Sequence, residues 1–178
     1  MQEVYILTGN PGKIKAANAV FNKYGLTVKS INLDMPEIQA STSAEIARNA
    51  ALAAFKKLNK PVVREDHSFY ISELKFPGPY MSYVDKAIDV NHLLKIVDTL
   101  EDRSGYYELS AAFVDQEGNL HEFSYKVPVE FALEPRGDKS KNWERIIRFP
   151  KESKVFAEYP ESERIEIWGG ETTRTLQS

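Results

Sequence analysis

Apolar and polar residues recur along the chain in two different periods, which predicts strands and helices in alternation. Val4-Tyr5-Ile6-Leu7 is a short apolar run typical of a buried strand. Residues 27–31 alternate between polar and apolar, as a second strand does. Between the two runs, apolar residues repeat at helical spacing and stop before Gly25: Ile14, Ala17, Phe21 and Tyr24. This order of elements favours an α/β fold.

A second helix is predicted from its start signal. Thr42-Ser43-Ala44-Glu45 has the spacing of a capping box, and apolar residues continue on one face up to Leu58. Residues 61–64 predict a short strand with Glu65 and Asp66 at its end. Because ligands of α/β sheets lie at the carboxyl ends of strands, we expect these acids to meet the segment after the first strand.

The second half of the chain is richer in β-branched and aromatic residues. Residues 106–114 and 120–132 predict an antiparallel hairpin with a loop between them. Residues 69–71 resemble a brief strand, residues 92–100 a helix with an apolar stripe, and residues 165–168 a last strand. No internal repeat divides the chain, so we expect residues 1–178 to form a single domain.

Composition and charge narrow the class of protein. The chain has 42% hydrophobic and 28% charged residues, as soluble globular proteins do. A net charge of -3 without a long basic run argues against nucleic acid or an anionic membrane as the main partner. The absence of cysteine excludes disulfides and thiolate catalysis. No apolar run approaches the roughly 20 residues of a membrane span, and the chain starts directly with a strand, so we expect a cytoplasmic protein.

The segment Thr8-Gly9-Asn10-Pro11-Gly12-Lys13 joins the first strand to the first helix and predicts a phosphate site. Glycine lets the backbone approach an anion, the first helical N–H groups lack partners within the helix, and Lys13 adds a positive charge. The segment matches neither the Walker pattern nor the three-glycine dinucleotide motif. The alternative interpretation is an ordinary turn that Asn10 caps.

Acidic residues occur at two places that such a site could use. Asp34 and Glu37 flank Pro36, and Glu65 and Asp66 follow a strand; carboxylates of this kind hold Mg²⁺ together with substrate phosphates. Asp66 would then orient or deprotonate an attacking water, which leads to the hypothesis of nucleotide phosphoanhydride hydrolysis. The alternative is that these acids are solvated loop residues and helix caps.

Two further side chains could contact a nucleotide. His67, beside the acids, could reach a phosphate, although a lone histidine is more often structural. Trp143 could stack on a base, although core packing is the more common use of such a ring.

The glycine segment resembles the T-G-N-x-x-K opening of the inosine triphosphate pyrophosphatase family. Further stretches resemble the family in the same order: residues 33–39, 61–66, 76–80, 134–137 and 155–158. The resemblance implies an elongated α/β fold with a mixed twisted sheet flanked by helices and a cleft between two lobes. It also implies Mg²⁺-dependent hydrolysis of non-standard nucleoside triphosphates to the monophosphate and pyrophosphate, and usually a homodimer.

The family's functional residues can be carried over to matching positions. Asp66 would be the proton acceptor, with Lys13 beside the phosphates. The residues expected to contact substrate are Thr8, Gly9, Asn10, Lys13, His67, Trp143, Glu144 and Arg164. The residues expected to serve Mg²⁺ are Glu37, Glu65 and Asp66.

The sequence also departs from the family pattern. A lysine of the second helix falls at Ala50, D-S-G-L is replaced by Asp66-His67-Ser68-Phe69, and the late lysine matches Arg164 at best. The S-H-R base-recognition motif is absent, with Trp168-Gly169-Gly170 in its place. Three interpretations follow: a pyrophosphatase with another base preference, a weak or inactive nucleotide-binding protein on the same scaffold, or an enzyme for a different phosphate ester.

Overall fold

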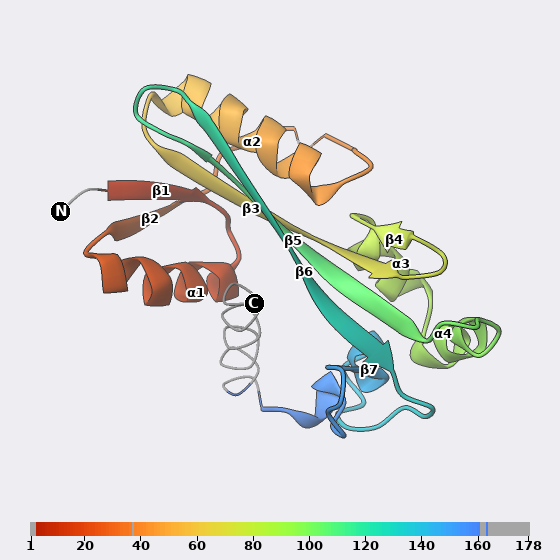
Figure 1. The fold of residues 1–178 in the computed structure, drawn as a ribbon. Helices are drawn as coiled ribbons and strands as arrows, with labels where there is room; N and C mark the ends of the chain where they lie inside the picture. The colour runs from red at the N-terminus through yellow and green to blue at the C-terminus, as the bar shows by residue number, and fades with distance from the viewer. Residues whose placement is uncertain (1–2, 37, 161–162, 164–178) are drawn as a thin grey trace. The chain divides into compact units, whose positions relative to one another are not determined.

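The computed structural model describes residues 3–36, 38–160 and 163 (Figure 1). These residues gather in two compact units, the first made by residues 1–67 with 109–124 and the second by residues 68–108 with 125–178. Each unit is described by itself, and the single domain expected from the sequence stays a prediction. In the part of the chain that the structure describes, no helix is both long and apolar enough to cross a membrane.

A mixed sheet runs through both units. Its strands are β1 (Glu3–Leu7), β2 (Thr27–Ile31), β3 (Val62–Ile71), β4 (Phe76–Gly78), β5 (Ser104–Val114), β6 (Leu120–Phe131) and β7 (Ile147–Arg148). They pair in the order β2-β1-β3-β5-β6-β7, and β4 pairs with β3. β1 lies parallel to β2 and β3, whereas β3–β4 and β6–β7 are antiparallel. The prediction of a mixed α/β fold is therefore confirmed.

The first unit contains two helices, α1 (Pro11–Phe21) and α2 (Ser43–Leu58), on β1, β2 and the first part of β3 (Figure 1). α1 continues into the 3-10 helix η1 (Asn22–Tyr24), which ends at Gly25 with a left-handed φ of 69°. Thr42 caps α2 by accepting a hydrogen bond from the Glu45 N–H at 3.2 Å. The start and end signals in the sequence thus act as predicted.

Small side chains allow α2 to pack closely on the sheet. Ala47, Ala51 and Ala54 are fully buried against Leu7 and Val62, with residues of β5 completing the cluster. Alanines keep the helix close to the strands while they fill the interface at the density of a protein interior. α2 is thereby fixed against one face of β1 and β3.

The second unit contains α3 (Met81–Ala87), α4 (Val90–Val97), and the short 3-10 helices η2 (Trp143–Arg145) and η3 (Phe156–Glu158). Its core is aromatic: the Phe69 ring lies 4.7 Å from Tyr107 and 6.1 Å from Trp143 between centroids. Phe149 and Phe156 extend this core with centroids 4.6 Å apart. Tilted ring pairs at such distances add to the hydrophobic burial.

The structure corrects the prediction for residues 61–71. β3 is one strand from Val62 to Ile71 rather than two short strands, so Glu65 and Asp66 lie within the strand and not at its carboxyl end. The charged residues predict a break, but the strand continues because its polar side chains find partners on the two faces of the sheet. The hairpin of β5 and β6 has a loop at residues 115–119 as predicted, and the predicted strand at 165–168 lies outside the described residues.

Candidate active site

The glycine segment forms a tightly bonded turn between β1 and α1. The Asn10 side chain caps α1, since its Oδ1 accepts hydrogen bonds from the N–H groups of Gly12 at 2.8 Å and Lys13 at 3.4 Å. Thr8 Oγ1 accepts a further bond from the Asn10 N–H at 3.1 Å, and Ser30 Oγ donates to the Thr8 carbonyl at 2.8 Å. The capping interpretation is correct for Asn10. The expectation of unsatisfied helical N–H groups is wrong for Gly12 and Lys13.

Adjacent residues of β3 face opposite sides of the sheet, and this divides the polar residues into two sets. On the side of α1, Lys13 Nζ lies 2.8 Å from Glu65 Oε2 and donates to the Glu65 carbonyl at 3.4 Å. His67 Nε2 contacts the same carboxylate. Lys13, Glu65 and His67 therefore form one polar group, which we call the Lys13 cluster.

His67 is neutral at pH 7 within this cluster. Burial lowers the pKa of His67 to about 4, and the nearby Lys13 acts in the same direction, although the Glu65 carboxylate opposes both. A neutral imidazole donates only one N–H, and its contact with Glu65 assigns that proton to Nε2. The lowered pKa favours the neutral form of His67, and its contact with a phosphate remains a proposal.

The Lys13 cluster lines part of an apolar hollow of about 680 Å³. α1 contributes Ala17 and Phe21 to its walls, and the sheet contributes Ile6, Val63 and Phe113. Apolar walls with a few polar groups at one end are typical of sites for small molecules.

The second set lies on the opposite face of β3. Arg64 Nη1 donates to the Leu7 carbonyl at 3.2 Å, and Arg64 Nη2 lies 3.8 Å from Asp66 Oδ1. The Arg64 and Asp66 side chains are each 19% exposed, so their charges are only partly screened by solvent. Arg64 also lines a small hollow of about 80 Å³ together with Thr8, Gly9 and Ala50.

The three expected Mg²⁺ ligands do not form one cluster among the described residues. No group of three or more His, Asp or Glu side chains is arranged there to hold a metal. Glu65 is engaged by Lys13 and His67, whereas Asp66 lies on the other face with Arg64. Glu37 lies outside the described residues. Asp66 alone still suits Mg²⁺, which is bound in many enzymes by one or two carboxylates, water and substrate phosphates.

The remaining substrate residues belong to the second unit or to the part not described. Trp143 is only 2% exposed and its Nε1–H donates to the Ile88 carbonyl at 2.8 Å, so its ring is a core residue and not a surface for stacking. Glu144 follows it in η2 and is half-buried. Arg164 lies outside the described residues.

The sequence predicts a strand at Arg64 and no further role for it, because a single arginine in an apolar run carries no motif. The signal that could have found it is the strand period: Arg64 and Asp66, two positions apart, must share a face.

Comparisons with known proteins show the family of the chain. A model of the Ham1 family matches residues 4–168. A dITP/XTP pyrophosphatase from Ignicoccus hospitalis is 34% identical over 168 residues, which cover 93% of this chain and 89% of that protein. Inosine triphosphate pyrophosphatase 1 from Trypanosoma cruzi is 29% identical, with 93% and 85% covered.

Two solved structures share the fold. One is a nucleoside-triphosphatase / dITP/XTP pyrophosphatase from Mycobacterium abscessus, with a TM-score of 0.79 and 16% identity over 99% of this chain and 98% of that chain. The other is the Ham1 protein of Staphylococcus aureus, with a TM-score of 0.73 and 21% identity over 99% and 100%. At such identities the similarity concerns the fold alone.

Proposed function

Since the chain belongs to the Ham1 family, we propose that it hydrolyses a nucleoside triphosphate to the monophosphate and pyrophosphate with Mg²⁺. The observation that carries the proposal is that Arg64 and Asp66 lie on one face of β3. On this face Arg64 lines a small hollow together with Thr8 and Gly9 of the glycine segment. Relatives with 28–34% identity are named dITP/XTP or inosine triphosphate pyrophosphatases, which favours a non-standard purine base.

The glycine segment would receive the phosphates. Thr8 Oγ1 accepts from Asn10, so its own hydroxyl hydrogen is available for a phosphate oxygen. Gly9 lets the backbone approach the anion, and the positive end of the α1 dipole adds to the attraction. Lys13 lies in the first turn of α1 and contributes positive charge once its ammonium exchanges Glu65 for phosphate.

Asp66 would be the proton acceptor. Its carboxylate lies beside the Arg64 guanidinium, and a carboxylate placed near the attacking water can take a proton from it. A bound Mg²⁺ would polarise a phosphoryl oxygen and neutralise charge on the leaving pyrophosphate. Asp66 has the hard oxygen donors that this ion prefers, and Glu37 and Glu65 remain proposals as further ligands.

The other expectations of the family resemblance also remain proposals. These are the elongated two-lobed shape with a cleft, the homodimer, contacts of Glu144 and Arg164 with substrate, and a cytoplasmic location. A weak or inactive nucleotide-binding protein is the second candidate. The engagement of Glu65 by Lys13 favours it, because it removes one carboxylate and one cation from the phosphates in the ligand-free protein.

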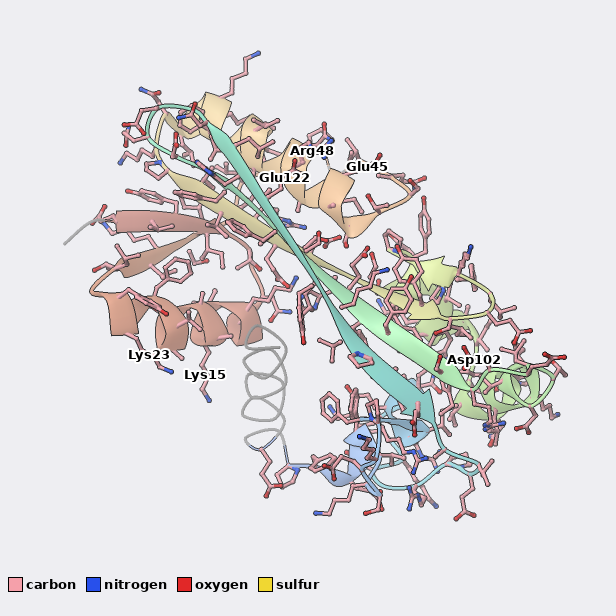
Figure 2. All side chains as sticks on the ribbon, in the orientation of Figure 1. Lys15, Lys23, Glu45, Arg48, Asp102 and Glu122 are labelled. Atoms are coloured by element: carbon pink, nitrogen blue, oxygen red, sulfur yellow. The ribbon has the colours of Figure 1, made fainter. Side chains whose placement is uncertain are left out.

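Pyrophosphate release from standard and modified nucleoside triphosphates with Mg²⁺ tests the proposal, with nucleoside monophosphates and sugar phosphates as comparison substrates. We expect turnover of at least one triphosphate and a loss of roughly 10²–10⁴-fold in Asp66→Asn, since general-base catalysis contributes about that much. Asp102→Asn is the matched control, because Asp102 is an exposed aspartate of the second unit (Figure 2).

The outcomes separate the candidates. If no triphosphate is turned over above the Asp66→Asn background, the enzyme is not a pyrophosphatase. Calorimetric titration with the same triphosphates then decides whether it still binds nucleotides. Turnover of monophosphates or sugar phosphates instead would assign it to a different phosphate ester.

A further inference from the structure

We propose that Arg64 is a phosphate-binding residue of this chain and holds the triphosphate against the glycine segment from the α2 face of β3. This inference rests on the proposed function and names a contact that the sequence motifs do not contain. Arg64 would recognise the phosphate chain of the substrate and not its base.

The helix start cannot hold the anion by itself. The N–H groups of Gly12 and Lys13 donate to Asn10 Oδ1, the Asn10 N–H donates to Thr8 Oγ1, and Pro11 has no N–H. These are the donors that a helix N-terminus usually offers to phosphate. Side chains must therefore supply much of the binding in this arrangement.

Lys13 is the motif's cation, but it points to the other face of β3. Its ammonium lies 2.8 Å from Glu65 Oε2, and the two side chains are 25% and 24% exposed, so they form a partly buried ion pair. Exchanging Glu65 for phosphate would break this ion pair and leave the carboxylate in contact with His67. Lys13 can contribute, but at the expense of a pair already formed.

Arg64 is already held where a phosphate of the glycine segment would lie. Its Nη1 donates to the carbonyl of Leu7, the last residue of β1, and its side chain forms one wall of the small hollow whose other walls include Thr8 and Gly9. α2 contributes only the Ala50 methyl group to this hollow, and Arg64 is the one cationic side chain among the described residues that line it.

The size of the hollow agrees with a phosphoryl group. Its volume is about 80 Å³, and a small anion such as one phosphoryl group needs no more space than a few water molecules do. A guanidinium suits such an anion because its planar fork donates two parallel hydrogen bonds.

The test measures binding of inorganic triphosphate, which lacks a base, by calorimetry in the presence of EDTA. We expect the Kd to rise roughly 10- to 100-fold in Arg64→Met, as for loss of one or two charge-assisted hydrogen bonds. Arg64→Lys keeps the charge but lacks the planar fork, so its Kd should lie between those of wild type and Arg64→Met. Binding of inosine triphosphate should weaken in parallel.

Arg48→Met is the matched control. Arg48 lies on α2 in the same unit, is exposed, and points toward Glu122, with Nε 2.9 Å from Oε1 (Figure 2). Its replacement removes the same charge from the unit without touching the hollow. Its Kd should stay within about twofold of wild type, because surface charges of this kind act weakly and are screened.

Failure of this proposal is distinguishable from failure of the proposed function. If wild type releases pyrophosphate but Arg64→Met binds triphosphate as Arg48→Met does, Arg64 is not a phosphate ligand and the function stands. If wild type neither binds nor turns over any triphosphate, both proposals fail. Should Arg64→Met not fold, ¹⁵N-arginine spectra of wild type decide. The assigned Arg64 Nε signal should shift with inorganic triphosphate, and an unchanged signal overturns the proposal.

Discussion

Asn10 caps α1 and is proposed to bind phosphate, and a single substitution can separate the two roles. Its side-chain oxygen caps α1, and the resemblance also places it among the phosphate contacts. Aspartate is as good an N-cap as asparagine, and its negative charge suits a helix N-terminus. The same charge repels phosphate.

Asn10→Asp should therefore keep the free energy of unfolding within about 0.5 kcal/mol of wild type or raise it, while the Kd for inorganic triphosphate rises at least tenfold. Asn10→Ala should lower the stability by about 1 kcal/mol because the cap is lost. Urea unfolding and calorimetry measure the two effects. Unchanged binding in Asn10→Asp would show that the anion does not approach this end of α1.

Asp115 should make the free energy of unfolding depend on pH under acidic conditions. Its carboxylate accepts hydrogen bonds from His121 Nε2 at 2.9 Å and from the Asn119 N–H at 2.8 Å in the loop between β5 and β6. The bond from His121 is the main reason that the pKa of Asp115 falls to about 2, and bonds from Asn119 and Glu117 act in the same direction. A lowered pKa stabilises the fold at every pH above the ordinary value of 3.8.

This contribution should be lost as the pH falls from about 3.8 to about 2. Asp115→Asn should lower the free energy of unfolding at pH 7 and flatten its pH dependence in that window. Urea unfolding of both proteins between pH 2 and pH 7 measures the difference. Parallel curves for the two proteins below pH 4 would contradict the role given to this carboxylate.

At the level of elements, Gly137 is the point of contact between two stretches that resemble the family, residues 134–137 and 155–158. It has a left-handed φ of 76°, and a Cβ at this position would lie 2.5 Å from the Ala157 carbonyl oxygen. The next N–H, of Asp138, donates to the same carbonyl at 3.0 Å. The loop that follows β6 therefore lies directly on η3, and only glycine allows the approach.

Gly137→Ala should lower the free energy of unfolding by at least about 2 kcal/mol, because the left-handed conformation and the steric clash both oppose a methyl group. Gly25→Ala is the matched control: its φ is 69°, but nothing lies within 4 Å of a Cβ there. The control should cost only about 1 kcal/mol, the conformational part. Thermal and urea unfolding compare them, and equal losses would show that the loop moves to accept the methyl group.

Elements with local signals were predictable from the sequence, whereas those with distant partners were not. Thr42 predicts the start of α2 and Gly25 the end of η1, because helix caps depend on residues only a few positions away. The sequence predicts two short strands in place of β3, because Glu65 and Asp66 resemble the end of a strand. Their partners include Lys13, 52 positions away, which no local pattern reveals.

The candidate site was predicted in its parts but not in its arrangement. The glycine segment and Asp66 follow from the motif, but a spacing cannot show that neighbouring acids face opposite sides of the sheet. The sequence also cannot show whether Trp143 stacks on a base or packs in the core, because its burial depends on the aromatic cluster of the second unit.

For the whole molecule, the two units have different cores on shared strands. The first is an alanine-rich cluster under α2 and the second is a cluster of aromatic rings, while β3, β5 and β6 run through both. The residues proposed to bind phosphate belong to the first unit. A ligand that binds the folded protein stabilises it by mass action, so thermal unfolding reports on the site without any turnover.

Inosine triphosphate at 100 times its Kd, with EDTA present, should stabilise wild type by about 2.7 kcal/mol. For a protein of this size that corresponds to a rise in Tm of roughly 5–10 °C. The nucleoside inosine at the same concentration should give no shift, because it lacks the phosphates that the glycine segment and Arg64 would bind. Scanning calorimetry of wild type and Arg64→Met with each ligand measures this. Equal shifts with inosine and inosine triphosphate would place the recognition on the base and contradict a phosphate-centred site.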